Sequence, residues 1–99
     1  GYKSLGYDRT EKAWVIEKTS PAAGPLTVEI AATKNRPVVN PCIIIRNCNK
    51  KPASFRQGDR LIKPGKSLRI GLEKRKDRTD MIIWRSVRSS QSVKFSIGF

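Results

Sequence analysis

Alternation of apolar and polar residues with a period of two runs through much of this chain and limits it to a β fold. Residues 26–32, 68–72 and 93–99 each place apolar side chains at every second position. Because successive side chains of a strand point to opposite faces, each stretch predicts a strand with one face in a core and one in water. No window shows a convincing helical period.

Two further stretches, residues 42–45 and 81–84, are apolar without interruption. Such runs are typical of central strands buried on both faces, or of strands with an apolar outer patch. Residues 13–16 form a shorter candidate strand, and turn signals separate the stretches at intervals of about ten residues. The pattern predicts an antiparallel β-sandwich of about seven or eight short strands, with a small β-barrel as the alternative.

The length of 99 residues is enough for one domain and too short for two. We therefore expect residues 1–99 to form a single domain, cut from a larger protein. The sequence has no apolar run of about 18 residues that could span a membrane, and it starts without a signal peptide.

Positive charge dominates the last two thirds of the chain. The 21 Lys and Arg outnumber the 8 Asp and Glu, which gives a net charge of +13. Residues 1–33 contain four residues of each sign, so the whole excess lies in residues 34–99. Such an excess opposes compaction by self-repulsion, which a polyanionic partner would relieve. A solubilising surface without a partner is the alternative.

The composition argues against catalysis and against a metal site. Without histidine, the chain has no general base near neutral pH and no Ser-His-Asp triad. Asp77 and Asp80 flank a loop rich in cations, where we expect them to balance charge rather than hydrolyse a glycoside. Cys42 and Cys48 do not match the spacing of zinc ligands, and an extended chain between them predicts two separate thiols, with a disulfide as the alternative. We predict a non-enzyme without cofactor or metal.

Basic residues form the candidate binding site. The densest cluster, on a predicted hairpin tip, is Lys74, Arg75, Lys76 and Arg78. Further basic residues occupy strand positions predicted to face outward: Arg46, Arg56, Arg69, Arg85 and Lys94. If several share one sheet, they form a positive stripe on strands about 4.8 Å apart, and the planar guanidinium binds a carboxylate or sulfate through two hydrogen bonds. A solvated charged surface is the alternative.

The two tryptophans have two candidate roles. Trp84 shares a face with Ile82, opposite Ile83 and Arg85, and Trp14 shares a face with Ile16. Core packing is the expected role of both. The functional alternative is a sugar-stacking platform next to an arginine, and for this reason Trp84 is included among the candidate binding residues.

Several motifs between residues 37 and 97 carry a resemblance. They are the Pro-Val-Val-Asn-Pro of residues 37–41, the Ile-Ile-Arg-Asn of 44–47, a hairpin with Gly58 followed by the Lys-Pro-Gly-Lys of 63–66, and the Thr-Asp-Met-Ile-Ile-Trp of 79–84. With residues 6–8 and 13–17, this stretch resembles the C-terminal β-sandwich domain of secreted bacterial polysaccharide-degrading enzymes.

The resemblance implies a carbohydrate-binding accessory module, secreted or at the cell surface, beside a catalytic domain of the same parent chain. The few aromatic residues and many cations favour a sulfated or uronic-acid polysaccharide over a neutral one. Two alternatives remain: a structural domain that packs on its catalytic neighbour, and a nucleic-acid-binding β domain, whose electrostatic footprint the pI of about 10.5 fits. Basic residues gathered on one face favour binding, whereas a scatter, or an apolar patch on the N-terminal strand, favours the structural role.

Overall fold

Short β-strands make up all the regular structure of this protein. The computed structural model describes residues 1–21 and 24–99, and these residues form strands and turns but no helix. In chain order the strands are β1 (Tyr2–Asp8), β2 (Ala13–Lys18), β3 (Leu26–Ile30), β4 (Val38–Val39), β5 (Cys42–Arg46), β6 (Ser54–Gln57), β7 (Arg60–Leu61), β8 (Leu68–Lys74), β9 (Thr79–Arg85), β10 (Arg88–Ser89) and β11 (Val93–Gly98). The predicted all-β sandwich is confirmed, and the extra strands β4, β7 and β10 are too short to produce a periodic pattern.

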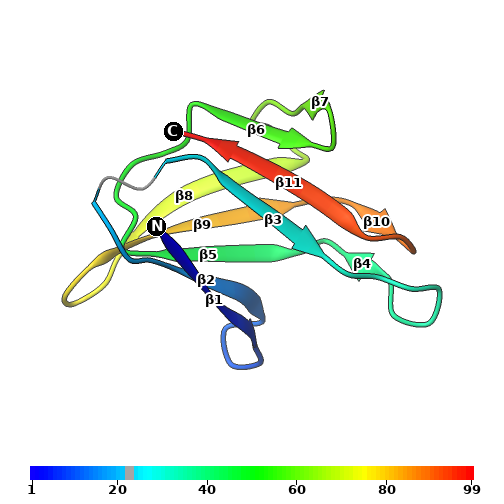
Figure 1. Cartoon of the computed structure of the whole chain (residues 1–99), viewed down its shortest axis with the longest axis horizontal. Helices are drawn as coiled ribbons and strands as arrows, with labels where there is room; N and C mark the ends of the chain where they lie inside the picture. The colour runs from blue at the N-terminus through cyan, green and yellow to red at the C-terminus, as the bar shows by residue number, and fades with distance from the viewer. Residues whose placement is uncertain (22–23) are drawn as a thin grey trace.

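Two main sheets form the layers of the sandwich. One has five strands in the order β1-β2-β5-β9-β8, and the other has four in the order β3-β11-β6-β7 (Figure 1). Strands β4 and β10 form a separate two-stranded ribbon. None of the described residues belongs to a helix that could cross a membrane.

One strand pair departs from the predicted antiparallel arrangement. β2 and β5 are parallel, with Trp14 opposite Ile43 and Ile16 opposite Ile45. A parallel pair needs a long crossover connection. The chain makes it by leaving β2, adding β3 to the other sheet and returning through β4 to β5. The crossover brings the segment of residues 31–41 beside the β1–β2 hairpin, although the two are far apart in sequence.

The main core lies between the two sheets. In the five-stranded sheet, Ile43 faces Ile83 and Ile45 faces Met81 across the β5–β9 pair. Phe55 and Phe95 meet them from the opposite sheet, and their ring centroids lie 5.2 Å apart. All of these side chains except the nearly covered Phe55 are completely buried, so the two sheets are held by one continuous apolar layer.

A second, smaller apolar cluster lies on the other face of the five-stranded sheet. Ala13, Val15 and Ile44 are buried there, and Cys42 and Ile82 pack against them. The prediction that the uninterrupted run at 42–45 marks a strand buried on both faces is therefore confirmed for its isoleucines. The β1–β2 hairpin turns toward this face, as the ion pair of its Glu11 with Arg75 at the end of β8 demonstrates.

Candidate ligand-binding site

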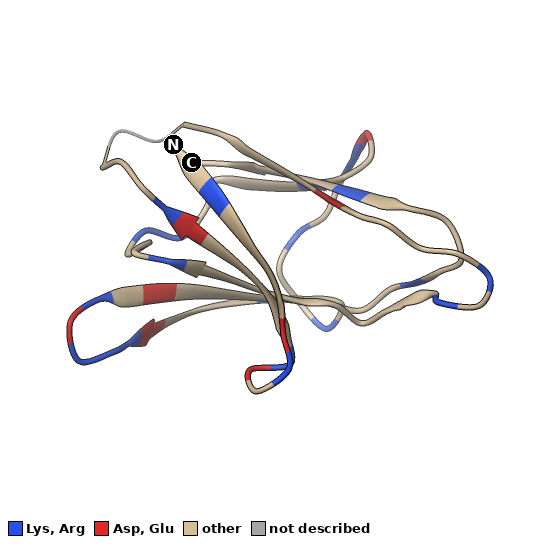
Figure 2. Cartoon of the chain, turned by 60° about the horizontal axis from the view of Figure 1, so that its bottom comes forward, with Lys and Arg blue, Asp and Glu red and all other residues tan. Residues whose placement is uncertain are grey.

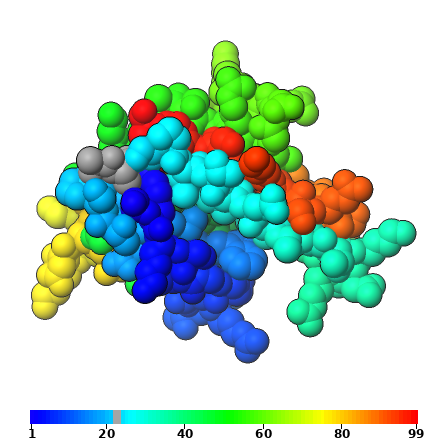
Figure 3. Space-filling view, in the orientation of Figure 1, coloured from blue at the N-terminus to red at the C-terminus, as the bar shows by residue number. Residues whose placement is uncertain are grey.

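A pocket of about 630 Å³ opens at the end of the sandwich, between the β1–β2 hairpin and the 31–41 segment. Its lining includes Tyr7, Lys12, Trp14, Arg36 and Val39. Figure 3 shows a hollow at this place, between the blue hairpin and the blue-green segment that precedes β5. The volume is within the range usual for sites that bind small molecules or cofactors.

An aromatic pair forms one wall of the pocket. Tyr7 and Trp14 are directly opposite each other in the β1–β2 pair, and their ring centroids lie 5.3 Å apart with an interplanar angle of 69°. This edge-to-face arrangement is the favoured one for two aromatic rings. Tyr7 is 52% exposed, whereas Trp14 is half-buried against the main core. The pair therefore offers a rigid apolar surface to a ligand.

Two cationic side chains, Lys12 and Arg36, line the same pocket, and no carboxylate lines it within the described part of the chain. The nearest acids on the hairpin are engaged elsewhere. Asp8 accepts hydrogen bonds from the backbone N–H groups of Thr10 and Glu11, and the Glu11 carboxylate pairs with Arg75 at 3.4 Å. The described lining of the pocket consequently combines an apolar wall with two cations and no carboxylate.

The backbone around the pocket is held in conformations that non-glycine residues rarely adopt. Lys12 has φ 55° and Asn40 has φ 43°, both in the left-handed region. The Asn40 N–H donates to the Val87 carbonyl at 2.7 Å, and its side-chain oxygen accepts from the Val87 N–H at 3.1 Å. Such outliers persist only where the surrounding contacts hold them, and they gather at functional sites.

The loop that carries Arg36 is closed by short hydrogen bonds. The Thr33 N–H donates to the Arg36 carbonyl at 3.0 Å, and the Arg36 N–H lies within hydrogen-bonding distance of both the carbonyl and the hydroxyl oxygen of Thr33. Because the backbone on both sides of the guanidinium stem is fixed, Arg36 approaches the pocket from a defined position.

Cys42 and Cys48 are both free thiols, as predicted, and only Cys42 lines the pocket. Burial raises the pKa of the Cys42 thiol, and the negative charge of Glu11 raises it further. A thiol with a raised pKa stays protonated and is a poor nucleophile. Cys48 is almost completely buried and lies away from the pocket.

The predicted basic candidates do not form a single stripe. Arg46 and Arg69 lie on the outer face of the five-stranded sheet, whereas Arg56 and Lys94 lie on the outer face of the four-stranded sheet. Figure 2 likewise shows lysine and arginine on loops and strand ends all around the fold. Lys94 is paired across the strands with Glu29, and Arg46 with Glu17, so part of this charge is locally balanced.

Arg85 was predicted to face outward, and this is wrong. It shares the inner face of β9 with Met81 and Ile83 and is 9% exposed. Its Nε donates to Gln57 Oε1 at 2.8 Å, and its Nη1 donates to the Ser67 carbonyl at 3.0 Å. The partners on the opposite sheet and on the 63–67 turn allow the guanidinium to be buried, and this burial lowers the pKa of Arg85.

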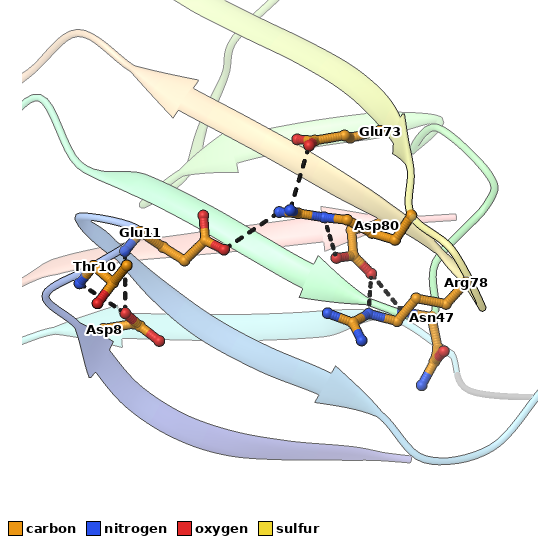
Figure 4. Close-up of polar contacts among 8 residues, drawn as sticks. Asp8, Thr10, Glu11, Asn47, Glu73, Arg78 and Asp80 are labelled. Carbon is orange, nitrogen blue, oxygen red and sulfur yellow. Dashed lines mark hydrogen bonds and ion pairs between the residues drawn. The ribbon is translucent and has the colours of Figure 1, made fainter.

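Two arginines of the 74–78 cluster are engaged within the protein (Figure 4). Asp80 is completely buried and accepts from Arg78 Nε at 2.9 Å and from Arg75 Nε at 3.3 Å. The Arg75 guanidinium also pairs with Glu73 and Glu11, each at 3.4 Å. Only Lys74 and Lys76 of the predicted cluster are exposed and lack a carboxylate partner among the described residues.

The structure places Arg69 beside Trp84. The functional alternative for Trp84 expected an arginine at such a place. The two residues are directly opposite each other in the β8–β9 pair, and the Arg69 guanidinium carbon lies 5.9 Å from the centroid of the Trp84 ring. This is a cation–π contact on the outer face of the five-stranded sheet. Trp14, in contrast, packs against the main core as predicted, and it also lines the pocket.

The reasoning from sequence missed Tyr7, Lys12 and Arg36 as site residues. Each looked unremarkable in its own segment, and only the β2–β5 crossover brings the segments together. One available signal was an aromatic pair separated by six residues, with the polar turn 9–12 in the middle. This places Tyr7 and Trp14 opposite each other if residues 8–13 form the end of a hairpin.

Comparison with protein-family models, with curated proteins and with solved structures found no match to this chain. The fold and the pocket by themselves describe this protein as an all-β sandwich whose end pocket is lined by aromatic and cationic side chains.

Proposed function

We propose that this chain is a non-catalytic module that binds an acidic polysaccharide, sulfated or rich in uronic acid, at the end pocket. The observation that carries the proposal is the placement of Lys12 and Arg36 beside the Tyr7–Trp14 pair in one pocket without a carboxylate in its described lining. Aromatic rings offer the apolar face of a sugar a flat surface, and the two cations select a sugar that carries a negative group.

The energies of these contacts favour a polymer over a small ion. An exposed ion pair contributes only about 0–1 kcal/mol, so two cations alone bind weakly. Ring stacking and further charge contacts along a chain would have to add to them. Binding should weaken as salt is raised but persist at physiological ionic strength, because the aromatic contribution is not screened.

The position of the termini is compatible with an accessory role. Residues 1 and 99 lie close together at the end of the sandwich opposite the pocket (Figures 1 and 2). A catalytic domain joined at either terminus would attach away from the pocket. The resemblance described above supports such a neighbour and a secreted or cell-surface location.

The test is binding to immobilised polymers at low and at physiological salt. The panel contains sulfated galactan, a glycosaminoglycan, a uronate polymer, a neutral glycan and single-stranded DNA. We expect saturable binding to one acidic glycan that survives physiological salt, while binding to DNA is lost. Equal binding to every polyanion that disappears with salt would contradict the proposal, because it would reflect net charge alone.

A charge-matched pair of double variants locates the site. Lys12→Gln with Arg36→Gln removes two cations from the pocket, and Lys63→Gln with Lys66→Gln removes two exposed cations from a turn outside it. We expect the pocket variant to weaken glycan binding about tenfold, as two contacts of about 0.7 kcal/mol each would produce. Equal losses in both variants would exclude the pocket as the site.

A structural role beside a catalytic domain is the second candidate, and specific observations favour it. Leu5 and Tyr7 on the edge strand β1 are 42% and 52% exposed, and the predicted basic residues are divided between two faces. If this role is correct, Leu5→Ser should weaken association with the rest of the parent protein and leave glycan binding unchanged. Loss of glycan binding with intact association would instead support the module.

A further inference from the structure

The five-stranded sheet ends at β8, whose outer edge pairs with no strand of the described chain (Figure 1). β8 is seven residues long, and its pairing with β9 has no register shift. The other three sheet edges are less regular or shorter: β1 has a register shift between Ser4 and Gly6, β3 has five residues and β7 has two. Bulges and short strands protect a sheet edge against the addition of another strand. β8 is therefore the longest regular edge of the described structure.

The backbone groups of Ile70 and Leu72 point toward this open edge. Just before β8, the Ser86 N–H donates to the Ser67 carbonyl at 2.8 Å, in the same register as the β8–β9 pair. Hydrogen-bonded and non-hydrogen-bonded pairs alternate in an antiparallel ladder. The odd-numbered residues of β8 therefore bond to β9, and the even-numbered residues direct their N–H and C=O groups away from it. Those of Ile70 and Leu72 have no backbone partner among the described residues.

The sequence of this edge is complementary to itself. If two copies of β8 pair in antiparallel fashion with Gly71 opposite Gly71, Ile70 of each copy lies opposite Leu72 of the other. These residues carry the outward backbone groups, so the register gives their N–H groups acceptors. In the same register, Arg69 of each copy lies opposite Glu73 of the other. Opposite charges directly across an antiparallel pair are stabilising.

The side chains along β8 are left incompletely covered by their own chain. Leu72 is 42% exposed and Ile70 is half-buried, so both offer apolar surface to a partner. Gly71 has no positive φ, and a Cβ added to it would meet no heavy atom of the described chain within 4 Å. The fold of one chain therefore does not require glycine here. Two backbones that cross at this residue do favour it, because the Cα atoms of a non-hydrogen-bonded pair approach to about 4.5 Å.

The two charged residues remain able to form bonds across the edge. Arg69 is exposed and forms no ion pair among the described residues, and its stacking on Trp84 leaves the in-plane N–H groups available. Glu73 is paired with Arg75 at 3.4 Å, and its carboxylate has the capacity to accept further hydrogen bonds. Each copy therefore offers one donor and one acceptor to the other.

From these observations we infer that the protein associates with a second copy of itself through β8, in an antiparallel pair centred on Gly71 that joins the two five-stranded sheets into one. The inference goes beyond the proposed function and does not depend on it. Each copy carries a net charge of +13, so repulsion opposes the dimer and salt that screens it favours association. Pairing of one strand buries a small area, and the dimer should dissociate on dilution.

Sedimentation equilibrium of the whole chain at about 0.15 M salt tests the inference. We expect a mass that rises from 11.1 kDa toward twice this value as the concentration increases. Leu72→Pro should abolish the increase, because proline removes an N–H at the open edge and none that bonds to β9. Leu61→Pro is the matched control. Leu61 is an exposed leucine on the edge strand β7, and the bond from the Ile62 N–H to the Phe55 carbonyl places the Leu61 N–H on the open side.

Charge reversal tests the register. Arg69→Glu alone and Glu73→Arg alone each place like charges opposite each other at both ends of the pair, and each should weaken the dimer about tenfold. An equimolar mixture of the two variants should form a mixed dimer with the affinity of the unchanged protein, because every charged pair is then of opposite sign. Neither residue lines the end pocket, and thermal denaturation establishes that each variant is folded. This test also stands if Leu72→Pro fails to fold.

The outcomes decide between this dimer and the other possibilities. A mass of 11.1 kDa at every concentration overturns the inference and leaves the edge to a strand of another protein. A dimer that persists in Leu72→Pro, or that Leu61→Pro disrupts equally, lies at another surface and also overturns it. If the charge reversals change nothing, or their mixture does not recover, the register centred on Gly71 is wrong. None of these results affects the proposed glycan binding, which is judged by its own variants.

Discussion

The two ends of the five-stranded sheet both carry cations, but in opposite settings. At the end where β8 turns into β9, Arg75 and Arg78 are bound to the buried Asp80, and a smaller pocket nearby also contains an acid, Asp77. At the other end, Lys12 and Arg36 line a pocket without a carboxylate in its described lining. The positive charge of the first end holds the fold together, whereas the charge of the second is available to a ligand.

The difference shows that local charge density is a poor guide to a binding surface. The 74–78 cluster is the most basic segment of the chain, yet its two arginines serve internal ion pairs. A cation is available for binding when the fold places no acid beside it. The comparison therefore predicts opposite consequences for mutations at the two ends: loss of stability at one and loss of binding at the other.

The largest expected effect is at Asp80. Asp80→Asn removes the charge of a completely buried carboxylate that Arg75 and Arg78 share. Arg78 then has no acidic partner among the described residues, whereas Arg75 keeps Glu73 and Glu11. Breaking a buried pair costs about 3–5 kcal/mol, and the partial exposure of both arginines lowers this to about 2–3 kcal/mol. Urea denaturation measures the loss.

The control for this prediction is Asp77→Asn. Asp77 is an exposed acid in the turn that precedes β9, and its substitution should change stability by less than about 0.5 kcal/mol. A loss below about 1 kcal/mol for Asp80→Asn would mean that the arginines are solvated and that the two ends differ less than the ion pairs suggest.

The next effect separates the two ends directly. Arg75→Gln should reduce stability by about 1 kcal/mol and leave glycan affinity unchanged, because Arg75 is bound to Glu11, Glu73 and Asp80. The Lys12→Gln/Arg36→Gln variant should show the reverse. Chemical denaturation and glycan binding on the same samples provide both measurements. If Arg75→Gln weakened binding as strongly as the pocket variant, the assignment of roles to the two ends would be wrong.

A smaller effect is expected from the backbone of the pocket. Lys12→Gly should stabilise the fold by about 0.5–1 kcal/mol, because glycine adopts the φ of 55° without the steric cost of a side chain. It should also weaken glycan binding, since it removes a cation. Lys12→Gln, which removes the charge but keeps the strain, is the control and should not gain stability. Thermal denaturation is sensitive enough to decide.

The smallest effect concerns Cys42, whose side chain is half-buried and which lines the pocket. Its alkylation rate should rise with pH around a midpoint above that of an unperturbed thiol, because burial and Glu11 both disfavour the thiolate. Glu11→Gln should move the midpoint down, without reaching the unperturbed value, since the burial remains. A midpoint that does not move would show that Glu11 has no electrostatic influence on the pocket side of the sheet.

Several features of the fold could be predicted because they depend on local pattern. Alternation at 26–32 and 93–99 identified strands with one buried face, and the uninterrupted run at 42–45 identified a strand buried on both. The spacing of Trp84 and Ile82 also placed them correctly on one face. In each case the side-chain direction of a strand follows from its position alone.

Other features depended on partners that are distant in sequence. The charge of Arg85 suggested an outward position, but Gln57 and the Ser67 carbonyl supply the hydrogen bonds that make its burial tolerable. Arg75 could not be assigned to Glu11, which is 64 residues away in the chain. The same holds for the pocket, whose walls come from the β1–β2 hairpin and the 31–41 segment.

The sequence by itself determined that this chain forms an all-β fold of short strands with a large positive charge, because periodicity and composition are properties of short segments. The tertiary structure alone decided which cations are neutralised and which are available. That decision depends on the parallel β2–β5 crossover and on strand pairing, which place acids beside Arg75 and Arg78 and place aromatic rings beside Lys12 and Arg36. Electrostatic interactions act over distances in space rather than along the chain, so only the fold could assign the charge its role.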